Sequence, residues 1–425
     1  MTAHTTTTTV HTRETLELDE LNLKLLGEVL VNDYAGHPFQ IELSRTLAAF
    51  GYTVSHAYCN TNVTPRGSLE QTEEGPLIIG ISTGDGFDKY NIAKRLVAEV
   101  RYGAKSVRLM RSERPSVCLN SNVPVVSLAM ITLAARVMGI RNVLWLQDFQ
   151  AGLVAMSAGE QHPAATIARR VENWCVRKAD HVVAISDGFA REVETIREFG
   201  DAVSTIPNWA PIDDIPVVER NNQWAEAHDL VDRRVFLYSG TLGMKHRPAA
   251  LVELAKRLAK VDPTAVVLIV SESSGVEWVE SQRTATEPLE NIRILPFQPF
   301  EDLPAVMGSA EVLIALLEED AGEFSVPSKV LSYLCSGRPV LGLMPLENAA
   351  ARLINDVASA GLVSGDIEGF LNAGEALART PELGAGMGQR GRQYAETAFD
   401  VNVIAGQFLQ YLQTEKETEK EKVTK

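Results

Sequence analysis

The sequence predicts an α/β protein of two domains, each built around a parallel β-sheet. Short, continuously apolar runs alternate with longer segments of helical periodicity, which is the pattern of strands that are buried on both faces. The alternation stops at the proline- and aspartate-rich segment 206–218 and then begins again. A length of 425 residues also exceeds the size at which a single hydrophobic core usually stops growing.

The first series contains seven apolar runs and begins with EVLVNDY at Glu28. A helical pattern follows this run and ends at Gly51, a residue typical of the position after a helix. The other six runs are, in order, YTVSHAYC, PLIIGIS, SVCLNS, NVLWLQD, HVVAIS and VSTIP. We therefore expect a Rossmann-like domain over residues 28–212, preceded by a disordered, threonine-rich leader over residues 1–27.

The second series predicts another Rossmann-like domain, over residues 213–399. Its six apolar runs are VFLYSG, AVVLIVS, IRILPF, VLIALL, PVLGLM and GLVSG. The stretch Val401–Leu412 has helical periodicity but no strand after it, so we expect it to pack back across to the first domain. Residues 400–425 are thus predicted to form a crossover helix and a disordered charged tail.

The composition excludes several functional classes. A net charge of −15 argues against a general nucleic-acid binder, which needs a basic surface. The cysteines are scattered without a C-x-x-C pair, which predicts reduced, buried thiols and a cytoplasmic protein. The apolar segment Val123–Ile140 is interrupted by polar residues, so we expect a buried helix and not a membrane span.

The loop SGTLGMKH, which follows the first run of the second series, is a candidate phosphate-binding loop. Gly240 and Gly243 allow a ligand to approach the backbone, and Lys245 supplies a positive charge. A helix is predicted to start near His246–Pro248, where unpaired amides face an anion. The alternative is an ordinary strand-to-helix turn that carries a surface lysine.

The segment FSVPSK is a second candidate at the same edge of this domain. Ser325 or Ser328 is placed to cap the helix that follows, with Pro327 at its entry. Lys329 then lies at the helix N-terminus and is available to bind an anion. The alternative is plain capping with a solvated lysine.

Four strand-end loops of the first domain also carry polar residues. NDYAGHPFQ contains Gly36 and His37 but lacks the G-x-G-x-x-G pattern, so it does not indicate a dinucleotide cofactor. Asp148, in WLQDF, is placed either to hold sugar hydroxyls or to cap a helix. Asp187 is predicted to cap a helix, and Asn208 leads into the linker.

Two kinds of motif are missing from the sequence. No D-x-D motif follows a predicted strand, and no His, Asp and Glu residues recur at metal-ligand spacing. No G-x-S-x-G elbow is found either. We therefore expect neither a metal-dependent mechanism nor a serine hydrolase.

The ordered motifs together resemble the family 4 retaining glycosyltransferases of bacterial polysaccharide assembly. The segments that carry the resemblance lie between Glu28 and Phe399 and are VLVNDYAGHPFQIELSRTLAAFGYTVSHAY, VVAISDGFA, IPNW, FLYSGTLGMKH, NIRILPFQPFEDLPAVMGSAEVLIALL and VPSKVLSYLCSGRPVL. The resemblance implies a GT-B fold, in which two Rossmann-like domains face each other. The C-terminal domain then holds the donor, and the N-terminal domain receives the acceptor.

The resemblance also implies roles for several residues. The family's phosphate-binding lysine falls on Lys245 and its loop glycine on Gly240, whereas Thr241 stands where the family usually has an arginine. The first of the family's two glutamates falls on Gly322, with Glu323 adjacent, and the second falls on Ser332. Ser328 and Lys329 are candidates to compensate, and the candidate catalytic residues are Lys245, Glu323 and Asp148.

The implied reaction is transfer of a sugar from a nucleotide-diphosphate sugar to an acceptor hydroxyl, with retention of configuration and without metal or other cofactor. A lipid-linked or cell-surface polysaccharide precursor is the expected acceptor. Two alternatives remain open: a nucleotide-sugar epimerase that uses His37 or Asp148, and a non-catalytic protein that binds the nucleotide sugar. The oligomeric state is not predicted.

The stretch KRLVAEVRYGAKSVRLMRSER carries seven basic residues against two glutamates. Lys94, Arg101, Lys105 and Arg108 recur at helical spacing, and an apolar stripe of Leu96, Val100, Ala104 and Val107 accompanies them. This pattern is compatible with peripheral docking on anionic lipid. The alternative is an ordinary solvated helix face.

Overall fold

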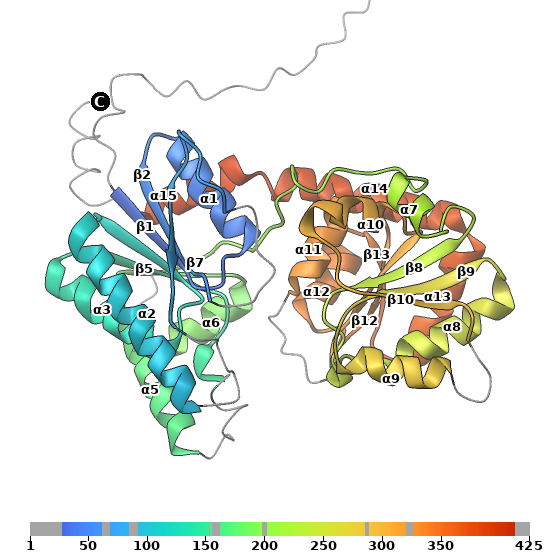
Figure 1. Cartoon of the computed structure of the whole chain (residues 1–425), viewed down its shortest axis with the longest axis horizontal. Helices are drawn as coiled ribbons and strands as arrows, with labels where there is room; N and C mark the ends of the chain where they lie inside the picture. Colours follow the sequence, from blue (N-terminus) through green and yellow to red (C-terminus); the bar gives the residue numbers. More distant parts are fainter. Residues whose placement is uncertain are drawn as a thin grey trace, which may run out of the picture.

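The structure is a computed structural model that describes residues 28–61, 69–84, 92–152, 154, 162–197, 202–284, 289–319 and 326–412. It contains two parallel β-sheets, each in its own lobe (Figure 1). All thirteen predicted apolar runs are strands of these sheets, so the predicted fold class is confirmed. The leader, the charged tail beyond residue 412, Ser325 and Glu323 lie outside the described residues.

The first sheet has seven strands in the order β3-β2-β1-β4-β5-β6-β7. Their bounds are β1 Glu28–Asp33, β2 Thr53–Cys59, β3 Leu77–Ile81, β4 Val117–Ser121, β5 Arg141–Leu146, β6 His181–Ala184 and β7 Val203–Thr205. The helices of this lobe are α1 Pro38–Ala49, α2 Ile92–Glu113, α3 Val125–Met138, α5 Pro163–Lys178 and α6 Asp187–Ile196.

The second sheet has six strands in the order β10-β9-β8-β11-β12-β13. Their bounds are β8 Arg234–Ser239, β9 Ala265–Val270, β10 Ile292–Leu295, β11 Val312–Leu316, β12 Val340–Leu343 and β13 Gly361–Ser364. The helices that follow β7 are α7 Gln223–Ala227, η2 Met244–His246, α8 Ala249–Val261, α9 Ser274–Arg283, η3 Phe300–Asp302, α10 Leu303–Gly308, α11 Ser328–Cys335, α12 Ala349–Arg352, η4 Leu353–Val357, α13 Ile367–Arg379, α14 Pro381–Ala398 and α15 Val401–Leu412.

Each sheet is covered on both faces, as its continuous apolar strands require. In β1, Val29 and Val31 belong to the apolar core on the side of α1 and α15. Leu30 points the other way, into the core formed with α2, α3, α5 and α6. In β8, Phe236 and Tyr238 likewise face α8 and α13, whereas their neighbours face α11 and α14.

The last helix returns to the first lobe. α15 contacts α1 and β5, although α14, which directly precedes it, packs on α11 in the other lobe (Figure 1). Phe408 of α15 meets Trp145 of β5 with ring centroids 4.8 Å apart. Arg141 Nε also donates to the Tyr411 carbonyl oxygen at 2.8 Å. The final helix therefore completes the core of the first lobe.

Each sheet has one switch point, where the order of the strands reverses. In the first sheet β1 lies between β2 and β4, and in the second β8 lies between β9 and β11. The loops after the two strands at such a point diverge to opposite faces and leave room for a ligand. The fold therefore directs attention to the loops after β1 and β4, and to those after β8 and β11.

Several local expectations can now be compared with the structure. The four cysteines are free and buried, as predicted. The predicted cap at Asp187 is wrong: Ser186 is the N-cap, its Oγ accepting from the Phe189 amide at 3.3 Å, and Asp187 is the first helical residue. Val123–Ile140 does form a helix, α3, but Leu133 and Val137 are exposed, so the helix is only partly buried. Within the described ranges, no helix combines the length and the apolar character needed to cross a bilayer.

Candidate functional site

The loop after β8 begins with a glycine that the local geometry requires. Gly240 has φ of +116°, a backbone conformation that side chains disfavour. A Cβ atom added there would lie 3.2 Å from Lys329 Nζ. The loop backbone and the first turn of α11 are therefore in close contact, as expected if the two predicted loops share one site.

Lys329 is held at this contact by a tyrosine. Its Nζ donates to Tyr238 Oη at 2.9 Å and lies 4.0 Å from the centre of the same ring. Tyr238 Oη in turn donates to the Thr241 carbonyl oxygen at 2.7 Å. Burial lowers the pKa of Lys329 to about 8, and no carboxylate of the described residues lies within ion-pair distance of it. Within the part of the chain that the structure describes, the site thus holds a cation without a counter-ion.

Lys245 approaches the same loop from η2 and does have a counter-ion. Its Nζ lies 3.0 Å from Glu318 Oε1, just beyond the end of β11. The side chain of Lys245 is more than half exposed, at 56%, so it can exchange this partner for a ligand. Burial lowers the pKa of His246, and the charges of Lys329 and Lys245 lower it further. The charges of Lys245 and Lys329 make the surroundings of the loop after β8 electropositive.

Most amides of the loop after β8 donate hydrogen bonds to other groups of the protein. The amide of Gly240 donates to the Val270 carbonyl oxygen at 3.0 Å, and that of Gly243 donates to His246 Nδ1 at 3.0 Å. The Leu242 amide donates to two serine hydroxyls beyond β9. Three of the four amides of 240–243 are therefore bonded within the protein and are not open to a ligand. Of these four, only the Thr241 amide has no acceptor among the described residues.

The N-terminus of α11 also differs from expectation. Pro327 is the N-cap and makes no side-chain cap, while Ser328 is the first helical residue and is exposed. The prediction that Ser328 caps the helix is wrong, because Pro327 occupies the N-cap position and Ser328 is already inside the helix. Ser332 Oγ makes only a long bond, 3.4 Å, to the Ser328 carbonyl oxygen within the helix. Among the described residues of this segment, Lys329 is therefore the side chain best placed to bind an anion.

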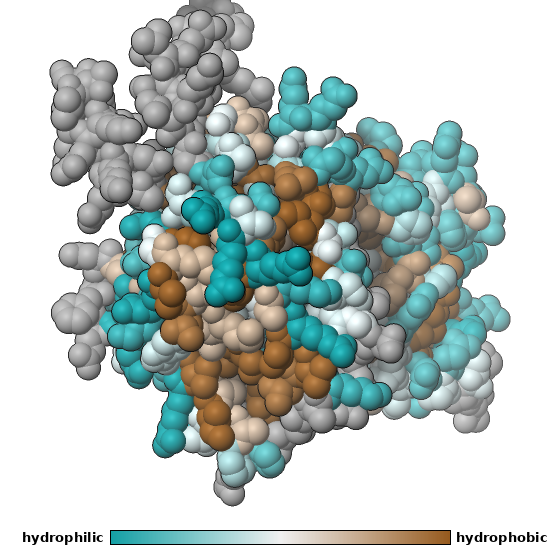
Figure 2. All heavy atoms as spheres, turned by 60° about the vertical axis from the view of Figure 1, so that its left-hand side comes forward, coloured by the Kyte–Doolittle hydropathy of each residue, from teal (hydrophilic) through white to brown (hydrophobic). Residues whose placement is uncertain are grey.

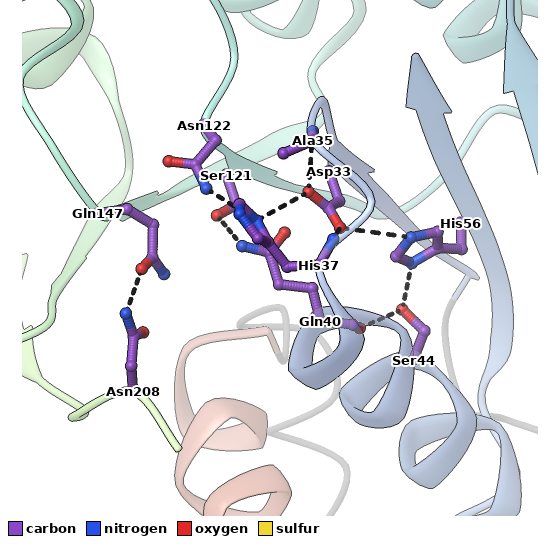
Figure 3. Close-up of polar contacts among 10 residues, drawn as sticks. All are labelled: Asp33, Ala35, His37, Gln40, Ser44, His56, Ser121, Asn122, Gln147 and Asn208. Atoms are coloured by element: carbon purple, nitrogen blue, oxygen red, sulfur yellow. Dashed lines mark hydrogen bonds and ion pairs between the residues drawn. The ribbon is translucent and has the colours of Figure 1, made fainter. Parts of the chain in front are cut away.

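The switch point of the first sheet is organised around a buried carboxylate that the sequence analysis did not single out. Asp33, the last residue of β1, is fully buried and accepts from the amides of Ala35 at 3.1 Å and His37 at 2.7 Å (Figure 3). The Gln40 amide, turned with its nitrogen toward the carboxylate, donates to Asp33 at 2.8 Å and accepts from Ser121 Oγ at 2.7 Å. These bonds fix the loop that contains Gly36.

Two histidines flank this carboxylate in different environments. His56 is fully buried and 3.8 Å from Asp33, and burial lowers its pKa to about 4, so it is neutral at pH 7. Its Nδ1 shares a 2.8 Å hydrogen bond with Ser44 Oγ. His37 is partly exposed and bonds Asn122 Nδ2 through Nδ1 at 3.3 Å (Figure 3). His37 is thus the histidine that a ligand can reach.

Amide side chains extend this edge toward the linker. Asn208 donates to Gln147 Oε1, while Asn208 Oδ1 and Gln147 Nε2 are buried and have no partner of their own (Figure 3). Asp148 is the next residue. Its side chain reaches solvent, yet the surrounding protein displaces enough water to raise its pKa, and the nearby His37 acts in the opposite direction. Donor and acceptor groups suited to hydroxyls are therefore gathered here.

The structure brings the predicted residues together as two clusters. Lys329 lies at Gly240 and Lys245 at Gly243 of the same loop, and both charges act on His246. His37 lies close enough to Asp148 to influence its charge. Asn122 and Glu318, like Asp33, were missed, although each directly follows a predicted strand at a switch point. No group of three or more His, Cys, Asp and Glu side chains in the described part of the chain is arranged to hold a metal ion.

Comparison with known proteins agrees with this architecture. Residues 40–209 match the family described as Glycosyl transferase 4-like domain. Over 216 residues the chain is 27% identical to WcaI of Escherichia coli (strain K12), a protein named for colanic acid biosynthesis and as a glycosyl transferase. That match covers 48% of this chain and 51% of WcaI, so the chain spans about half the length of this curated relative.

Solved structures extend the likeness over the whole fold. Alr3699/HepE from Anabaena, solved in complex with UDP, aligns with a TM-score of 0.66 over 91% of this chain and 99% of its own, at 16% identity. Sucrose-phosphate synthase (tll1590) from Thermosynechococcus elongatus aligns with a TM-score of 0.66 over 90% of this chain and 98% of its own, also at 16% identity. Identities this low show the fold alone. Taken together, the matches agree with the resemblance inferred from the motifs: residues 40–209 match the glycosyl transferase 4-like domain, and the whole chain shares the two-domain fold of these solved structures.

Proposed function

We propose that the protein transfers a sugar from a nucleotide-diphosphate sugar to an acceptor hydroxyl. The observation that supports this most directly is the pair of lysines at the switch point of the second sheet. Lys245 is exposed and Lys329 has no counter-ion among the described residues, and both charges act on His246, in the loop that contains the open Thr241 amide. A diphosphate supplies the anionic oxygens that such a site lacks.

The proposed chemistry needs no protein nucleophile. The bond between the anomeric carbon and the phosphate oxygen breaks, and its electron pair passes to the departing diphosphate. The acceptor oxygen bonds to the same face of that carbon, so configuration is retained, and its proton passes to a phosphate oxygen. Fixed cations such as Lys245 and Lys329 stabilise the charge that grows on the diphosphate, and we infer that they do so without a metal.

We infer that the acceptor binds at the switch point of the first sheet. Among the described residues, Gln147 Nε2 and Asn208 Oδ1 have no partner, and together with His37 they offer both a donor and acceptors to sugar hydroxyls. Asp148 is placed to orient the reacting hydroxyl, while Asp33 holds the loop around it. The relative named for colanic acid biosynthesis supports a saccharide precursor of a surface polysaccharide as the acceptor.

Turnover of a panel of nucleotide sugars tests the proposal. Purified protein is incubated with UDP-, GDP- and TDP-sugars, alone and with saccharide acceptors, and the released nucleotide diphosphate is measured. Two complexes of HepE, with UDP and with UDP-glucose, make UDP-glucose the first donor to try. Release that increases with acceptor supports the transferase. An isomerised donor, or binding of every donor without turnover, would contradict it.

A further inference from the structure

The outer face of the first lobe exposes apolar side chains that no described segment covers. Figure 2 shows apolar atoms gathered on this side of the molecule, with hydrophilic side chains among and around them. Large apolar residues contribute from three neighbouring helices, with exposures of 42–79%: Leu96, Val97 and Val100 of α2, Leu133 and Val137 of α3, and Ile167 of α5. We call these six residues the outer apolar face.

The outer apolar face is not part of the core. α2 packs on α3 through its other side, where Tyr102 and Met110 are fully buried. At this contact a Cβ added to Gly103 would lie 2.9 Å from Met130 Sδ. Leu96, Val100 and Ala104 of the predicted apolar stripe are therefore on the solvent side of α2, whereas Val107 packs against the core. An apolar stripe that a helix does not need for its own packing indicates a partner.

The charge of these helices is opposite to that of the protein. α2, α3 and α5 contain eleven Lys and Arg residues against three Glu, whereas the remainder of the chain has 29 basic against 52 acidic residues. A partner that binds the outer apolar face must therefore also be compatible with the positively charged side chains of these helices.

Two of the three glutamates do not face outward. Glu99 is buried, pairs with Arg95 at 2.9 Å and accepts from the Val126 amide at the start of α3. Glu172 is also buried and accepts from the amides of Gln150 and Ala151, and burial raises its pKa to about 7. Only Glu113 is exposed, at the end of α2, so the outward charge of the three helices is almost entirely positive.

We propose that this face docks on the surface of an anionic lipid bilayer. The outer apolar face enters the boundary between headgroups and acyl chains, and the surrounding Lys and Arg side chains contact the phosphates. A neutral membrane would use only the apolar contacts, and an acidic protein would not require so many apolar groups at the centre of the contact. The docking does not depend on the proposed chemistry. The further idea, that docking presents a lipid-borne acceptor to the first lobe, rests on the proposed function.

Co-sedimentation of the full-length protein with vesicles tests the proposal. Vesicles of phosphatidylcholine are compared with vesicles that contain about one third phosphatidylglycerol, at low and at high salt. We expect binding to the anionic vesicles that weakens with salt, because each Lys or Arg near such a surface contributes about 1 kcal/mol, which is on the order of fivefold in partitioning. Binding that does not distinguish the two lipids would overturn the proposal.

Two variants separate the apolar and the ionic parts. Leu96→Gln with Val97→Gln and Val100→Gln is expected to lower vesicle binding at both salt concentrations by about tenfold. Arg108→Gln with Arg111→Gln is expected to lower it mainly at low salt. Matched controls on the second lobe, Val357→Gln with Leu383→Gln and Lys256→Gln with Lys260→Gln, should bind vesicles as the wild type does. Equal binding by test and control variants would contradict the assignment of this face.

Two further measurements separate lipid docking from self-association and from nucleotide binding. Sedimentation velocity without lipid reports self-association; if the wild type dimerises and the apolar variant is monomeric, the face binds a second copy and the lipid proposal is wrong. Thermal stabilisation by UDP reports the nucleotide site. It should be the same in the docking variants and the wild type, so a failure of docking can be told apart from a failure of the proposed function.

Discussion

At the switch point of the first sheet, the buried Asp33 carboxylate accepts hydrogen bonds from the amides of Ala35 and His37. At that of the second sheet, the Lys329 ammonium group is bound to a tyrosine hydroxyl, and Lys245 shares an exposed ion pair. The first cluster satisfies its charge within the protein, and the second leaves positive charge available. The first therefore serves to hold a loop in place, whereas the second is suited to bind an anion.

The largest effect is expected from removing the exposed cation. Lys245→Ala should lower turnover of the nucleotide sugar by at least about 100-fold, because one preorganised donor to the developing charge is worth about 10² to 10³. Steady-state kinetics at saturating donor measures this. Lys256→Ala removes a lysine of the same domain that pairs with Glu253 on α8, and it should leave turnover unchanged. If Lys245→Ala turns over as the wild type does, Lys245 is not part of the mechanism.

Lys329→Met should weaken nucleotide-diphosphate binding by about 10- to 100-fold, the range expected for a hydrogen bond to a charged group. Calorimetry with UDP at pH 7 provides the measurement. Because the pKa of Lys329 is lowered to about 8, the wild-type affinity should also fall as the pH rises through 8. The affinity of the Lys329→Met variant should not fall in this pH range. An unaltered affinity and pH profile would rule out Lys329 as the second phosphate cation.

The same lysine should oppose stability. Its pKa is about 8 in the folded protein and about 10.4 when unfolded, so between these values the unfolded chain binds more protons and stability rises with pH. Below pH 8 the folded state carries the full cost of a desolvated charge. Thermal unfolding at pH 7 should therefore show Lys329→Met to be at least as stable as the wild type. A clearly lower melting temperature would indicate that Lys329 is structural.

Asp33→Asn should have the opposite profile, with loss of stability and little direct effect on the anion site. The new amide group would face the donors of Ala35, His37 and Gln40, and an unsatisfied buried group costs about 1–3 kcal/mol. Urea unfolding measures the change in the free energy of unfolding. Asp148→Asn is the matched control, since its carboxylate reaches solvent and should not alter stability. Equal stability of both variants would contradict the structural role of Asp33.

The smallest effect is expected at the partner of Lys245. Glu318→Gln removes a partly exposed ion pair, and such pairs contribute about 0.2–1 kcal/mol, so UDP should bind up to about fivefold more tightly. Calorimetry at low salt is the suitable measurement, because the difference should shrink as salt screens the pair. Weaker binding would mean that Glu318 orients Lys245 and does not compete with the ligand.

The positions of the strands could be predicted from the sequence, whereas the hydrogen-bond and ion-pair partners of the polar groups could not. The thirteen strands coincide with apolar runs of the sequence, whereas the two switch points depend on the strand order, which only the structure gives. Glu318 lies 73 positions beyond Lys245, and nothing in either local sequence indicates their contact. The loop amides of Leu242 and Gly243 were expected to be open, but they are bonded to side chains that only the folded chain brings near. Local patterns thus fix the elements, and tertiary contacts decide which polar groups remain available.

For the helix α2, the sequence pattern did not indicate which side is buried. Its sequence contains two apolar stripes, one with Tyr102 and Met110 and one with Leu96 and Val100. Periodicity alone does not say which stripe meets the sheet. The close approach of α3 at Gly103 selects the first, and so the second is exposed.

The return of α15 to the first lobe bears on the order in which the protein folds during synthesis. All seven strands of the first sheet have been made once residue 205 has been added. Trp145, however, is packed against Phe408, which lies about two hundred positions beyond residue 205. Until that helix leaves the ribosome, the face of the sheet that α1 and α15 share is only partly covered. The second lobe, whose own core is made from residues before α15, can finish folding first. The lobe that is translated first is thus the lobe that matures last.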